Sequence, residues 1–511
     1  MDSTQISNIV PQAVRISDAI QPLRLRERQV THYKRICEIL DNFFFYVDGS
    51  EMGSGKSIIA GAIAITRKLP VVIFCPKSAR QNWYNTCAMY GISVYDLETG
   101  GVITYDTLRS TKGHQPRHNL LRRDDTGEVT QFYATTLFIQ LVKAGVLVIF
   151  DEFQKLKNKS DQYYAAKALM SHFYTIKSNS RVAFLSGTTM DKPEHTKNFM
   201  QLVGFIERRN LYTKIRGQIR LEGVDDLKTW ARRIDSNALE SFLLSHPFRS
   251  TRKGAENYIF ELFIEVIKPG IMSIMPSLQL DKNIKNGYYR LESTNEEKYK
   301  QAISNLKIVT RYDDETKTIV QSKENMGAIT KALINLQNAK KNIMFRKAKE
   351  DLTRNPNCKV ILYADYYEVI DYLLESLAEF NPLELTGRIS EDRRNENIAH
   401  FQEPNANYRL IIGNPLVGGM CINLHDVTGH YPRFTYIMPG FRTNELHQCT
   451  GRVVRDSMVG TATIRFVYGL AGDTLESNIL TCNYRKGNVL ELIHHEQDAC
   501  FPNQYESSFE T

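Results

Sequence analysis

The sequence predicts an α/β protein with two lobes, each built on a parallel sheet, and a mainly helical insert between them. Three observations favour this fold class. Short apolar runs alternate with helix-like patterns in both parts of the chain, a glycine-rich turn joins a strand to a helix near the start, and polar helical patterns fill the middle. Apolar runs bounded by Gly, Pro, Asp or Ser are typical of strands that are buried on both faces of a parallel sheet.

The apolar runs place the lobes along the chain. The first lobe is expected over 1–205, the insert over 206–350, the second lobe over 351–487 and a C-terminal tail over 488–511. Strands of the first lobe are expected at 43–47, 71–75, 102–105, 146–150 and 182–185, and those of the second at 360–364, 410–412, 435–438 and 464–468. Polar helical patterns at 294–309 and 326–349 predict the insert, and two prolines predict an irregular loop over 268–286.

Length and composition exclude several classes of protein. At roughly 150 residues per domain, a chain of 511 residues forms three or four structural units. Its 42 % hydrophobic and 24 % charged residues exclude a disordered or collagen-like chain. No apolar run is long enough to span a bilayer, and the N-terminus has no secretory signal, so we expect a soluble intracellular protein without a membrane partner. Eight cysteines without a CxxC pair argue against a disulfide scaffold and a zinc site.

The charge balance is mildly basic. The formal net charge of +8 is compatible with nucleic-acid binding, but many metabolic enzymes share it. Taken singly, each basic cluster is best interpreted as a solvated helix face. The clusters lie at 208–209, 214–220, 232–233, 249–253 and 340–349.

A phosphate-binding loop is predicted at Ser50-Glu-Met-Gly-Ser-Gly-Lys-Ser57, between a strand and an apolar helix at 58–65. The turn directs backbone N–H groups inward, and the helix N-terminus favours negative charge. Lys56 would reach the β- and γ-phosphates, and the Ser57 hydroxyl would bind Mg²⁺. Ser50 departs from the pattern GxxxxGK[ST], which begins with Gly. A fortuitous Gly-Lys-Ser is therefore the alternative for this loop taken alone.

Two adjacent acids, Asp151 and Glu152, follow the buried run at 146–150. Phosphoryl transfer needs a carboxylate at the end of a strand to hold hydrated Mg²⁺, which fits Asp151. It also needs a group that positions the attacking water, which fits Glu152. An acidic pair that only caps a strand is the alternative. About a hundred residues after a phosphate loop, the catalytic interpretation is favoured.

Further short motifs accompany these two in a fixed order. In the first lobe they are Leu25-Arg-Glu-Arg-Gln29, Glu51-Met-Gly-Ser-Gly-Lys56, Phe74-Cys-Pro-Lys-Ser78 with Asn82-Trp83, Ile103-Thr-Tyr-Asp-Thr-Leu-Arg109, Asp151-Glu-Phe-Gln-Lys-Leu-Lys-Asn158 and Leu185-Ser-Gly-Thr-Thr189. In the second they are Val360-Ile-Leu-Tyr363, Gly418-Gly-Met-Cys-Ile-Asn-Leu424, Gln448-Cys-Thr-Gly-Arg-Val-Val-Arg455 and Thr474-Leu-Glu476. Over about residues 20–487, this series resembles the superfamily-two helicase-like ATPases, and within them the Swi/Snf-like DNA translocases. The phosphate loop of that family tolerates a residue other than Gly at its first position.

The resemblance implies two tandem RecA-like lobes that use ATP and Mg²⁺. The implied nucleotide-binding residues are Gln29, which would read the adenine, Gly53, Ser54, Gly55, Lys56, Ser57 and Gln448. The implied metal ligands are Ser57 and Asp151. The implied catalytic residues are Lys56, Asp151, Glu152, Arg452 and Arg455. The implied nucleic-acid contacts are Lys77, Ser78, Thr104, Arg109 and Asn423.

Arg452 and Arg455 are three residues apart, so on a helix they would face the same way. Guanidinium groups match phosphate oxygens and stay charged at any working pH. In the family that the chain resembles, such arginines come from the second lobe to complete the ATP site when the lobes close, as an arginine finger does. A surface pair of arginines on an ordinary helix is the alternative.

Some positions depart from the family pattern. Phe153-Gln154 stands where many relatives have Ala-His, Thr189 where Pro is common, and Phe441-Arg-Thr443 where remodellers have Trp-Asn-Pro. No accessory module is evident, so compact viral or mobile-element forms are the nearest resemblance. The favoured function is an ATP-driven translocase on double-stranded DNA, with RNA as a possible partner. A strand-separating DNA or RNA helicase is the first alternative, and a non-hydrolysing ATP-binding scaffold is the second.

Overall fold

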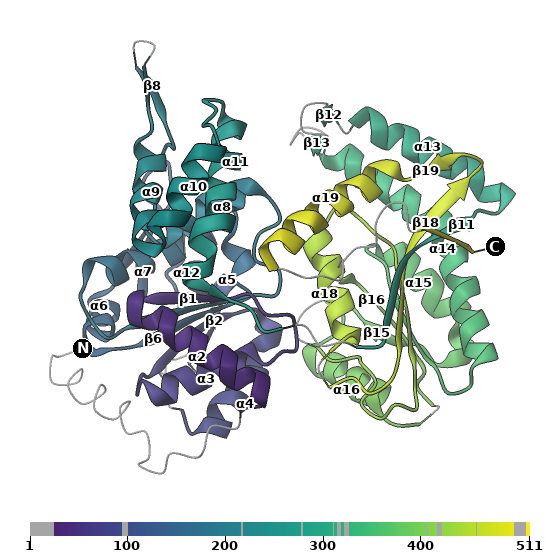
Figure 1. Ribbon diagram of the computed structural model, residues 1–511. Helices are drawn as coiled ribbons and strands as arrows, with labels where there is room; N and C mark the ends of the chain where they lie inside the picture. Colours follow the sequence, from purple (N-terminus) through teal and green to yellow (C-terminus); the bar gives the residue numbers. More distant parts are fainter. Residues whose placement is uncertain are drawn as a thin grey trace. The chain divides into compact units, whose positions relative to one another are not determined.

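The protein is described by a computed structural model that covers residues 25–92, 94, 101–215, 218–276, 280–309, 311–313, 318–320, 326–405, 407–415, 422–455, 457–494 and 507–510 (Figure 1). The chain divides into two compact units. Unit 1 comprises 1–276 together with 492–494, and unit 2 comprises 277–491 together with 495–511. The predicted fold class, with two RecA-like lobes built on parallel sheets, is confirmed by the strand order in each unit.

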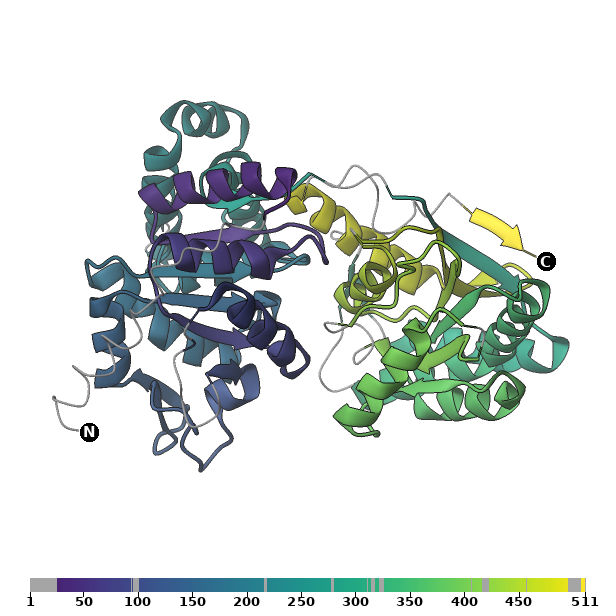
Figure 2. The same ribbon diagram turned by 90° about the horizontal axis from the view of Figure 1, so that it is seen from below.

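Unit 1 is built on a parallel sheet with the strand order β10-β1-β7-β6-β2-β3. Helices α3 and α4 lie on one side of this sheet and α7 and α8 on the other (Figures 1 and 2). The strands are β1 (Phe45–Asp48), β2 (Val71–Cys75), β3 (Val102–Thr104), β6 (Leu147–Asp151), β7 (Arg181–Leu185) and β10 (Met272–Ser273). The helices that pack on or beside it are α2 (Glu27–Asn42), α3 (Lys56–Thr66), α4 (Arg80–Tyr90), α5 (Tyr105–Arg109), α6 (Thr136–Ala144), α7 (Asp161–Thr175) and α8 (Pro193–Leu202).

Two hairpins and a helical layer complete unit 1. The β8–β9 hairpin projects away from the sheet at the top of Figure 1. The hairpins are β4–β5 (Leu121–Asp124, Gln131–Ala134) and β8–β9 (Thr213–Ile215, Gln218–Arg220). The layer consists of α9 (Glu222–Ile234), α10 (Ser236–Ser245), α11 (Arg252–Leu262), the π-helix η3 (Phe263–Ile267) and α12 (Lys268–Ile271).

Unit 2 is built on a larger sheet with the strand order β15-β16-β14-β17-β18-β11-β20, in which β19 pairs antiparallel with β18. The strands are β11 (Lys282–Arg290), β14 (Lys359–Tyr363), β15 (Leu383–Leu385), β16 (Leu410–Gly413), β17 (Arg433–Ile437), β18 (Ala462–Ala471), β19 (Thr474–Leu475) and β20 (Ser507–Glu510). A separate small hairpin is formed by β12 (Arg311–Asp313) and β13 (Thr318–Val320). The main helices are α13 (Ser293–Val309), α14 (Met326–Arg354), α15 (Tyr367–Ser376), α16 (Glu391–Gln402), α18 (Thr443–Val453) and α19 (Ser477–His494).

The structure divides the expected insert, 206–350, between the two units, because the boundary lies after Pro276. The expected irregular loop over 268–286 was wrong. It contains α12, β10 and the start of β11, because β10 pairs with β1 and β11 pairs with β18. The expected tail over 488–511 contains the last turns of α19 and also β20, which pairs with β11.

The core beneath the carboxyl edge of the unit 1 sheet contains a stack of aromatic rings. The ring centroids of Phe74 and Phe150 lie 5.1 Å apart, and those of Phe150 and Phe184 lie 5.4 Å apart, with interplanar angles of 20° and 10°. These side chains are fully buried. Because they come from β2, β6 and β7, they fix the strands whose ends carry Asp151 and the residues after it.

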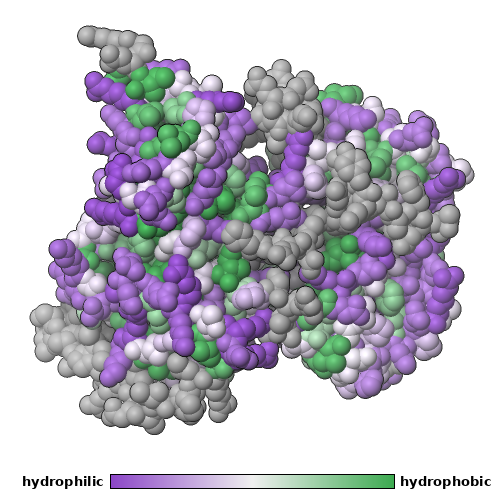
Figure 3. Space-filling model, viewed as in Figure 1, coloured by the Kyte–Doolittle hydropathy of each residue, from purple (hydrophilic) through white to green (hydrophobic). Residues whose placement is uncertain are grey.

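Within the described part of the chain, no helix is long and apolar enough to cross a membrane. The face drawn in Figure 3 is mostly hydrophilic, with apolar residues in small separate areas. Over the same described residues, no group of three His, Cys, Asp or Glu side chains is placed to hold a metal ion.

Candidate functional site

The predicted phosphate loop runs from the end of β1 to the start of α3. Gly53 and Gly55 have φ angles of 81° and 93°, which favour glycine because it has no Cβ atom. A Cβ atom on Gly55 would lie 2.4 Å from Nε2 of Gln29. That amide nitrogen donates to the carbonyl oxygen of Ser54 at 2.9 Å, and Oε1 of Gln29 accepts from the backbone nitrogen of Arg26 at 3.0 Å. Gln29 therefore braces the loop from α2.

Lys56 is the first residue of α3, and its side chain folds back over the loop. The Nζ atom donates to the carbonyl oxygens of Ser50 at 2.7 Å and Glu51 at 2.9 Å. Ser57 follows in the first turn of the helix, where backbone N–H groups have no partner within the helix. The hydroxyl of Ser54 is buried and has no hydrogen-bond partner among the described residues. These donors converge on one concave turn, which suits a phosphate group.

Ser50, at the position where the common pattern has Gly, is fully buried and bonded on two sides. Its backbone nitrogen donates to Oδ1 of Asp48 at 3.0 Å, and its hydroxyl accepts from the backbone nitrogen of Met275 at 2.9 Å. Oδ2 of Asp48 pairs with Nε2 of His32 at 3.0 Å, and Nδ1 of His32 lies 2.9 Å from the hydroxyl of Ser273. Ser50 thus ties the loop to α2 and to the segment around β10.

Asp151 lies at the carboxyl end of β6 and is held by two aromatic side chains. The indole nitrogen of Trp83 donates to its Oδ2 at 2.8 Å, and the hydroxyl of Tyr105 donates to its carbonyl oxygen at 2.8 Å. Burial and the charge of Glu152 raise the pKa of Asp151 to about 7, although the Trp83 hydrogen bond and the charge of Lys56 lower it. The charges of Lys56 and Glu152 therefore both act on the Asp151 carboxyl.

Glu152 adopts a left-handed backbone conformation with φ of 53° and begins a line of hydrogen bonds. Its Oε2 accepts from Nε2 of Gln154 at 2.6 Å, and Oε1 of Gln154 accepts from the hydroxyl of Ser186 at 2.7 Å. The backbone nitrogen of Thr188 donates to that same hydroxyl at 2.9 Å. The line connects Glu152, which directly follows β6, to the segment that follows β7. Gln154, which departs from the histidine of many relatives, is the middle of this connection.

The segment after β7 also packs directly against the phosphate loop. A Cβ atom on Gly187 would lie 3.2 Å from the backbone nitrogen of Met52, so a larger residue would crowd the loop. Further along, Asp191 pairs with Nζ of Lys157 at 3.0 Å and with Nδ1 of His195 at 2.7 Å. These contacts join the predicted Lys-Asn extension to the start of α8.

Four of the five predicted nucleic-acid contacts follow neighbouring strands of unit 1. Lys77 and Ser78 come directly after β2, with Lys77 exposed, and Thr104 ends β3, where its hydroxyl accepts from the backbone nitrogen of Thr107 at 3.1 Å. Arg109 ends α5, and its Nη2 pairs with Oδ1 of Asp106 at 3.1 Å. Because β2 and β3 are parallel neighbours, these residues lie at the same edge of the sheet.

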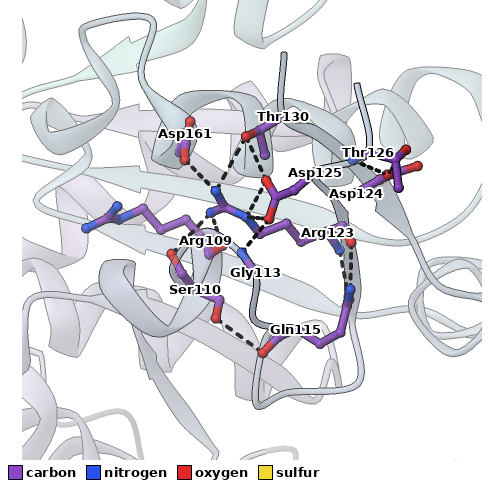
Figure 4. A network of polar contacts seen from close by, with 10 residues as sticks. All are labelled: Arg109, Ser110, Gly113, Gln115, Arg123, Asp124, Asp125, Thr126, Thr130 and Asp161. Atoms are coloured by element: carbon purple, nitrogen blue, oxygen red, sulfur yellow. Dashed lines mark hydrogen bonds and ion pairs between the residues drawn. The ribbon is translucent and has the colours of Figure 1, made fainter. Parts of the chain in front are cut away.

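The backbone at Arg109 is held by a network centred on the buried Arg123 (Figure 4). Nη1 of Arg123 donates to the carbonyl oxygens of Arg109 at 3.0 Å and Ser110 at 3.3 Å. Its Nε contacts both carboxylate oxygens of Asp125, and its Nη2 lies 3.1 Å from Asp161 of α7. Hydrogen bonding from Arg123 holds the pKa of Asp125 well below its usual range. The β4–β5 hairpin thereby fixes α5 against α7.

In unit 2 the structure corrects one sequence expectation. α18 ends at Val453, so Arg455 lies two residues beyond the helix and does not share a helix face with Arg452. Arg452 is buried, with 3 % of its surface exposed. Arg455 donates from Nε to the carbonyl oxygen of Gly451 at 3.0 Å and from Nη2 to that of Ile422 at 2.9 Å. Burial raises the pKa of Tyr363 far above its ordinary value. The charges of Arg452 and Arg455 both act on this hydroxyl and lower its pKa.

Two other unit 2 predictions are placed as follows. Gln448 is buried on α18. The carbonyl oxygen of Asn423 accepts from Nε2 of Gln402 at 2.7 Å. Residues 416–421, which include Gly418 and its neighbours in the predicted motif, lie outside the described residues.

The residues of unit 1 fit ATP and Mg²⁺. Cβ atoms at Gly55 and Gly187 would intrude on the loop, and the Ser54 hydroxyl is buried without a partner among the described residues. Asp151 is a single desolvated carboxylate beside Lys56. Mg²⁺ commonly takes few ligands from the protein, such as one carboxylate and a serine hydroxyl, and binds substrate phosphate oxygens as well. Asp151 and Ser57 are the residues that would hold the ion.

Sequence reasoning missed several residues that support this site. Trp83 and Tyr105 were recognised only as parts of motifs, and His32 and Asp48 were assigned no role. Trp83 lies 68 positions from Asp151, so no local pattern links them. The sequence signal for Asp48 was its charge, because this residue ends an otherwise apolar strand next to the phosphate loop.

The chain is similar to known proteins along most of its length. No protein-family model matches the chain. A putative ATP-dependent RNA helicase of Acanthamoeba polyphaga mimivirus is 26 % identical over 478 residues, which cover 90 % of this chain and 82 % of that protein. A solved structure of a Dbp5 variant from S. cerevisiae, bound to RNA and ADP BeF3, covers 92 % of this chain and 93 % of its own at 10 % identity, and its TM-score of 0.44 carries no argument. The similarity to the mimivirus protein supports a helicase-like ATPase, and it does not support the Swi/Snf-like branch in particular.

Proposed function

We propose that the chain is an ATP hydrolase whose turnover depends on nucleic acid. The observation that carries the proposal is the convergence of Lys56, Asp151 and Glu152 at one edge of the unit 1 sheet, where the charges of Lys56 and Glu152 both act on Asp151. A lysine, a metal-binding carboxylate and a second carboxylate beside a phosphate loop are the parts that phosphoryl transfer to water requires.

Each residue has a distinct role in this proposal. Lys56 leaves the carbonyl oxygens of Ser50 and Glu51 and binds the terminal phosphates, and Gln29 holds the loop in shape. Glu152 takes a proton from the attacking water, and its bond to Gln154 keeps the carboxylate in place. Asp151 and Ser57 hold Mg²⁺, which when bound supplies positive charge to the phosphate oxygens.

The first candidate for the nucleic-acid activity is strand separation by a helicase, with RNA as the first substrate to test. It is supported by the name of the mimivirus relative, which is similar along most of both chains. The second candidate is translocation on double-stranded DNA. It is favoured by the sequence details that resemble the Swi/Snf-like branch, among them the Lys157–Asn158 extension, whose lysine pairs with Asp191.

The test is ATP turnover, measured in parallel with no nucleic acid, duplex DNA, single-stranded DNA and RNA. It shows whether the chain hydrolyses ATP and whether nucleic acid stimulates the reaction. Stimulation by any of the three supports a nucleic-acid-dependent ATPase. A strand-displacement assay on RNA and DNA duplexes then separates a helicase from a translocase. Absence of turnover under every condition would contradict hydrolysis and favour an ATP-binding scaffold.

A further inference from the structure

Four cationic side chains gather on unit 1 at positions that the sequence motifs do not use. Lys159 lies between the motif at 151–158 and α7, Lys167 lies on α7, Lys197 lies on α8, and Arg209 lies in the loop after α8. We call these four residues the basic patch. Lys159 and Arg209 are exposed, and Lys167 and Lys197 are half-buried.

Direct contacts hold the elements that carry the basic patch together. The side-chain amide of Asn198, next to Lys197, donates to the carbonyl oxygen of Lys157 at 2.9 Å. The hydroxyl of Tyr163 on α7 donates to the carbonyl oxygen of Asn198 at 3.0 Å. The start of α8 is therefore fixed against both α7 and the segment that leads to Lys159.

The charges of the basic patch are poorly compensated. Burial and the charges of Lys197, Lys167 and Arg209 lower the pKa of Lys159, and the charge of Glu194 acts in the opposite direction. Glu194 also lies 3.4 Å from Arg252. Over the residues that the structure describes, none of the four cations forms an ion pair with an acid. Mutual repulsion of like charges disfavours the free protein and is relieved when a polyanion binds.

We propose that the basic patch binds the phosphate backbone of nucleic acid. The inference deepens the proposed function and rests on it. Lysine and arginine side chains contact phosphates without reading base sequence. The patch also adjoins the predicted contact at Arg109, because α7 packs against α5 and Nε2 of Gln162 on α7 lies 3.3 Å from Oδ1 of Asp106 on α5.

The test is the salt dependence of nucleic-acid affinity in the double variant Lys159→Gln, Lys197→Gln. Each phosphate contact contributes about 0.9 to the slope of log affinity against log salt on duplex DNA and about 0.7 on single strands. Loss of two contacts should therefore make the slope shallower by about 1.8 or about 1.4. Affinity at low salt should fall to a similar extent on oligonucleotides of equal length and different sequence.

A charge-matched control is the double variant Lys143→Gln, Lys177→Gln. Both lysines are exposed and precede β6 and β7, so they lie at the opposite edge of the sheet from the phosphate loop. The control removes the same net charge, and its salt slope should equal that of the parent. Because removal of a patch cation relieves repulsion, the melting temperature of the patch variant should be no lower than that of the parent.

The outcomes distinguish failure of the basic-patch inference from failure of the proposed function. If the parent binds nucleic acid and the patch variant keeps the parent's slope, the inference is overturned and the proposed function stands. If patch and control variants lose the same slope, net charge alone explains binding and the inference is likewise overturned. If the parent binds neither RNA nor DNA at low salt, the proposed function fails and the inference fails with it.

Discussion

The indole nitrogen of Trp83 donates a hydrogen bond to Oδ2 of Asp151 at 2.8 Å. Trp83 is almost fully buried on α4, and Asp151 ends β6, so the bond joins a helix to the strand that carries the acidic pair. A buried carboxylate with one neutral donor remains short of positive charge, which agrees with the rise of the Asp151 pKa to about 7. A divalent cation at this carboxylate would supply that charge.

Trp83 should therefore report on the metal site through its fluorescence. The chain contains two tryptophans, and Trp230→Phe leaves Trp83 as the single emitter. Phenylalanine at 230 retains a ring that can stack on Phe205, where the centroids now lie 4.4 Å apart. We expect Mg²⁺ with ATP to change the emission of this variant, because the charge state next to the indole changes. Adding Asp151→Asn should abolish the Mg²⁺-dependent part, and its persistence would mean that the ion binds elsewhere.

Removal of the loop lysine should stop turnover. Lys56→Ala removes the ammonium group that lies over the loop carbonyls of Ser50 and Glu51 and would neutralise the terminal phosphates. By analogy with the loss of a single charge-stabilising donor, turnover should fall by about 10²-fold or more and ATP binding should weaken. Lys34→Ala, on the exposed face of α2, is the matched control and should behave as the parent. Turnover near the parent rate in Lys56→Ala would show that this loop is not the site.

The two acids should separate in their metal dependence. Glu152→Gln keeps an oxygen that can accept from Gln154 and loses the group that takes a proton, so Mg·ATP should bind while turnover falls by about 10²–10⁴-fold. Asp151→Asn should instead raise the Mg²⁺ concentration needed for half-maximal ATP binding. Titration of Mg²⁺ against a fluorescent ATP analogue measures both variants. Equal Mg²⁺ dependence in the two would contradict the roles assigned here.

The sequence predicted the parts of the fold that depend on local pattern. The apolar run at 71–75 coincides with β2, and the phosphate loop stands between β1 and α3 as expected. It could not predict β10, because these two residues form a strand only by pairing with β1 more than two hundred positions earlier. β11 begins with the polar stretch Lys282-Asn-Ile-Lys-Asn286 and was expected to be a loop, yet it pairs with β18 along its full length. The sequence likewise did not predict that α18 ends before Arg455, whose guanidinium contacts the carbonyl oxygens of Gly451 and Ile422.

The buried pair of His32 and Asp48 should give the protein an acid-sensitive stability. Burial raises the pKa of Asp48. Attraction to His32 and Lys56 and the hydrogen bonds from His32 and Ser50 lower it by a larger amount, so the net shift is downward. A carboxyl whose pKa is lower in the folded state stabilises it above the unfolded value of about 3.9, and that contribution disappears as the pH falls through the folded value.

His32→Gln should therefore lower the free energy of unfolding at pH 5 by about 3–5 kcal/mol, the usual cost of removing one partner of a buried pair. The deficit relative to the parent should shrink as the pH falls below about 3.9. Urea unfolding at pH 5 and pH 3 measures it. His246→Gln is the control, because that histidine forms a partly exposed pair with Glu265 at 3.4 Å and should cost little at either pH. An equal deficit in His32→Gln at both values would exclude the proposed linkage.

The two arginines of the predicted motif at 448–455, Arg452 and Arg455, differ in their surroundings, and this difference makes their variants informative. Arg452 is buried on α18, so its truncation tests packing together with catalysis. Arg455 is half-buried beyond the helix and donates to the backbone carbonyl oxygens of Gly451 and Ile422. Carbonyl oxygens are neutral acceptors, and a guanidinium group binds phosphate oxygens more strongly than these. Arg455 is therefore the better candidate for exchange between a resting contact and ATP.

If Arg455 completes the ATP site only when nucleic acid is bound, Arg455→Ala should lose stimulation by nucleic acid while ATP still binds. Loss of an arginine finger costs about 10³-fold or more in turnover. Arg455→Lys keeps the charge without the planar fork and should recover only a small part of the rate. Arg452→Ala should show a similar loss together with a lower melting temperature, whereas Arg455→Ala should melt near the parent. Arg442→Ala is the control, because Arg442 is exposed before α18 and its pair with Glu445 is long, at 3.4 Å. Full stimulation of Arg455→Ala would remove Arg455 from the mechanism, and full stimulation of both variants would contradict the role that the family resemblance implies for these arginines.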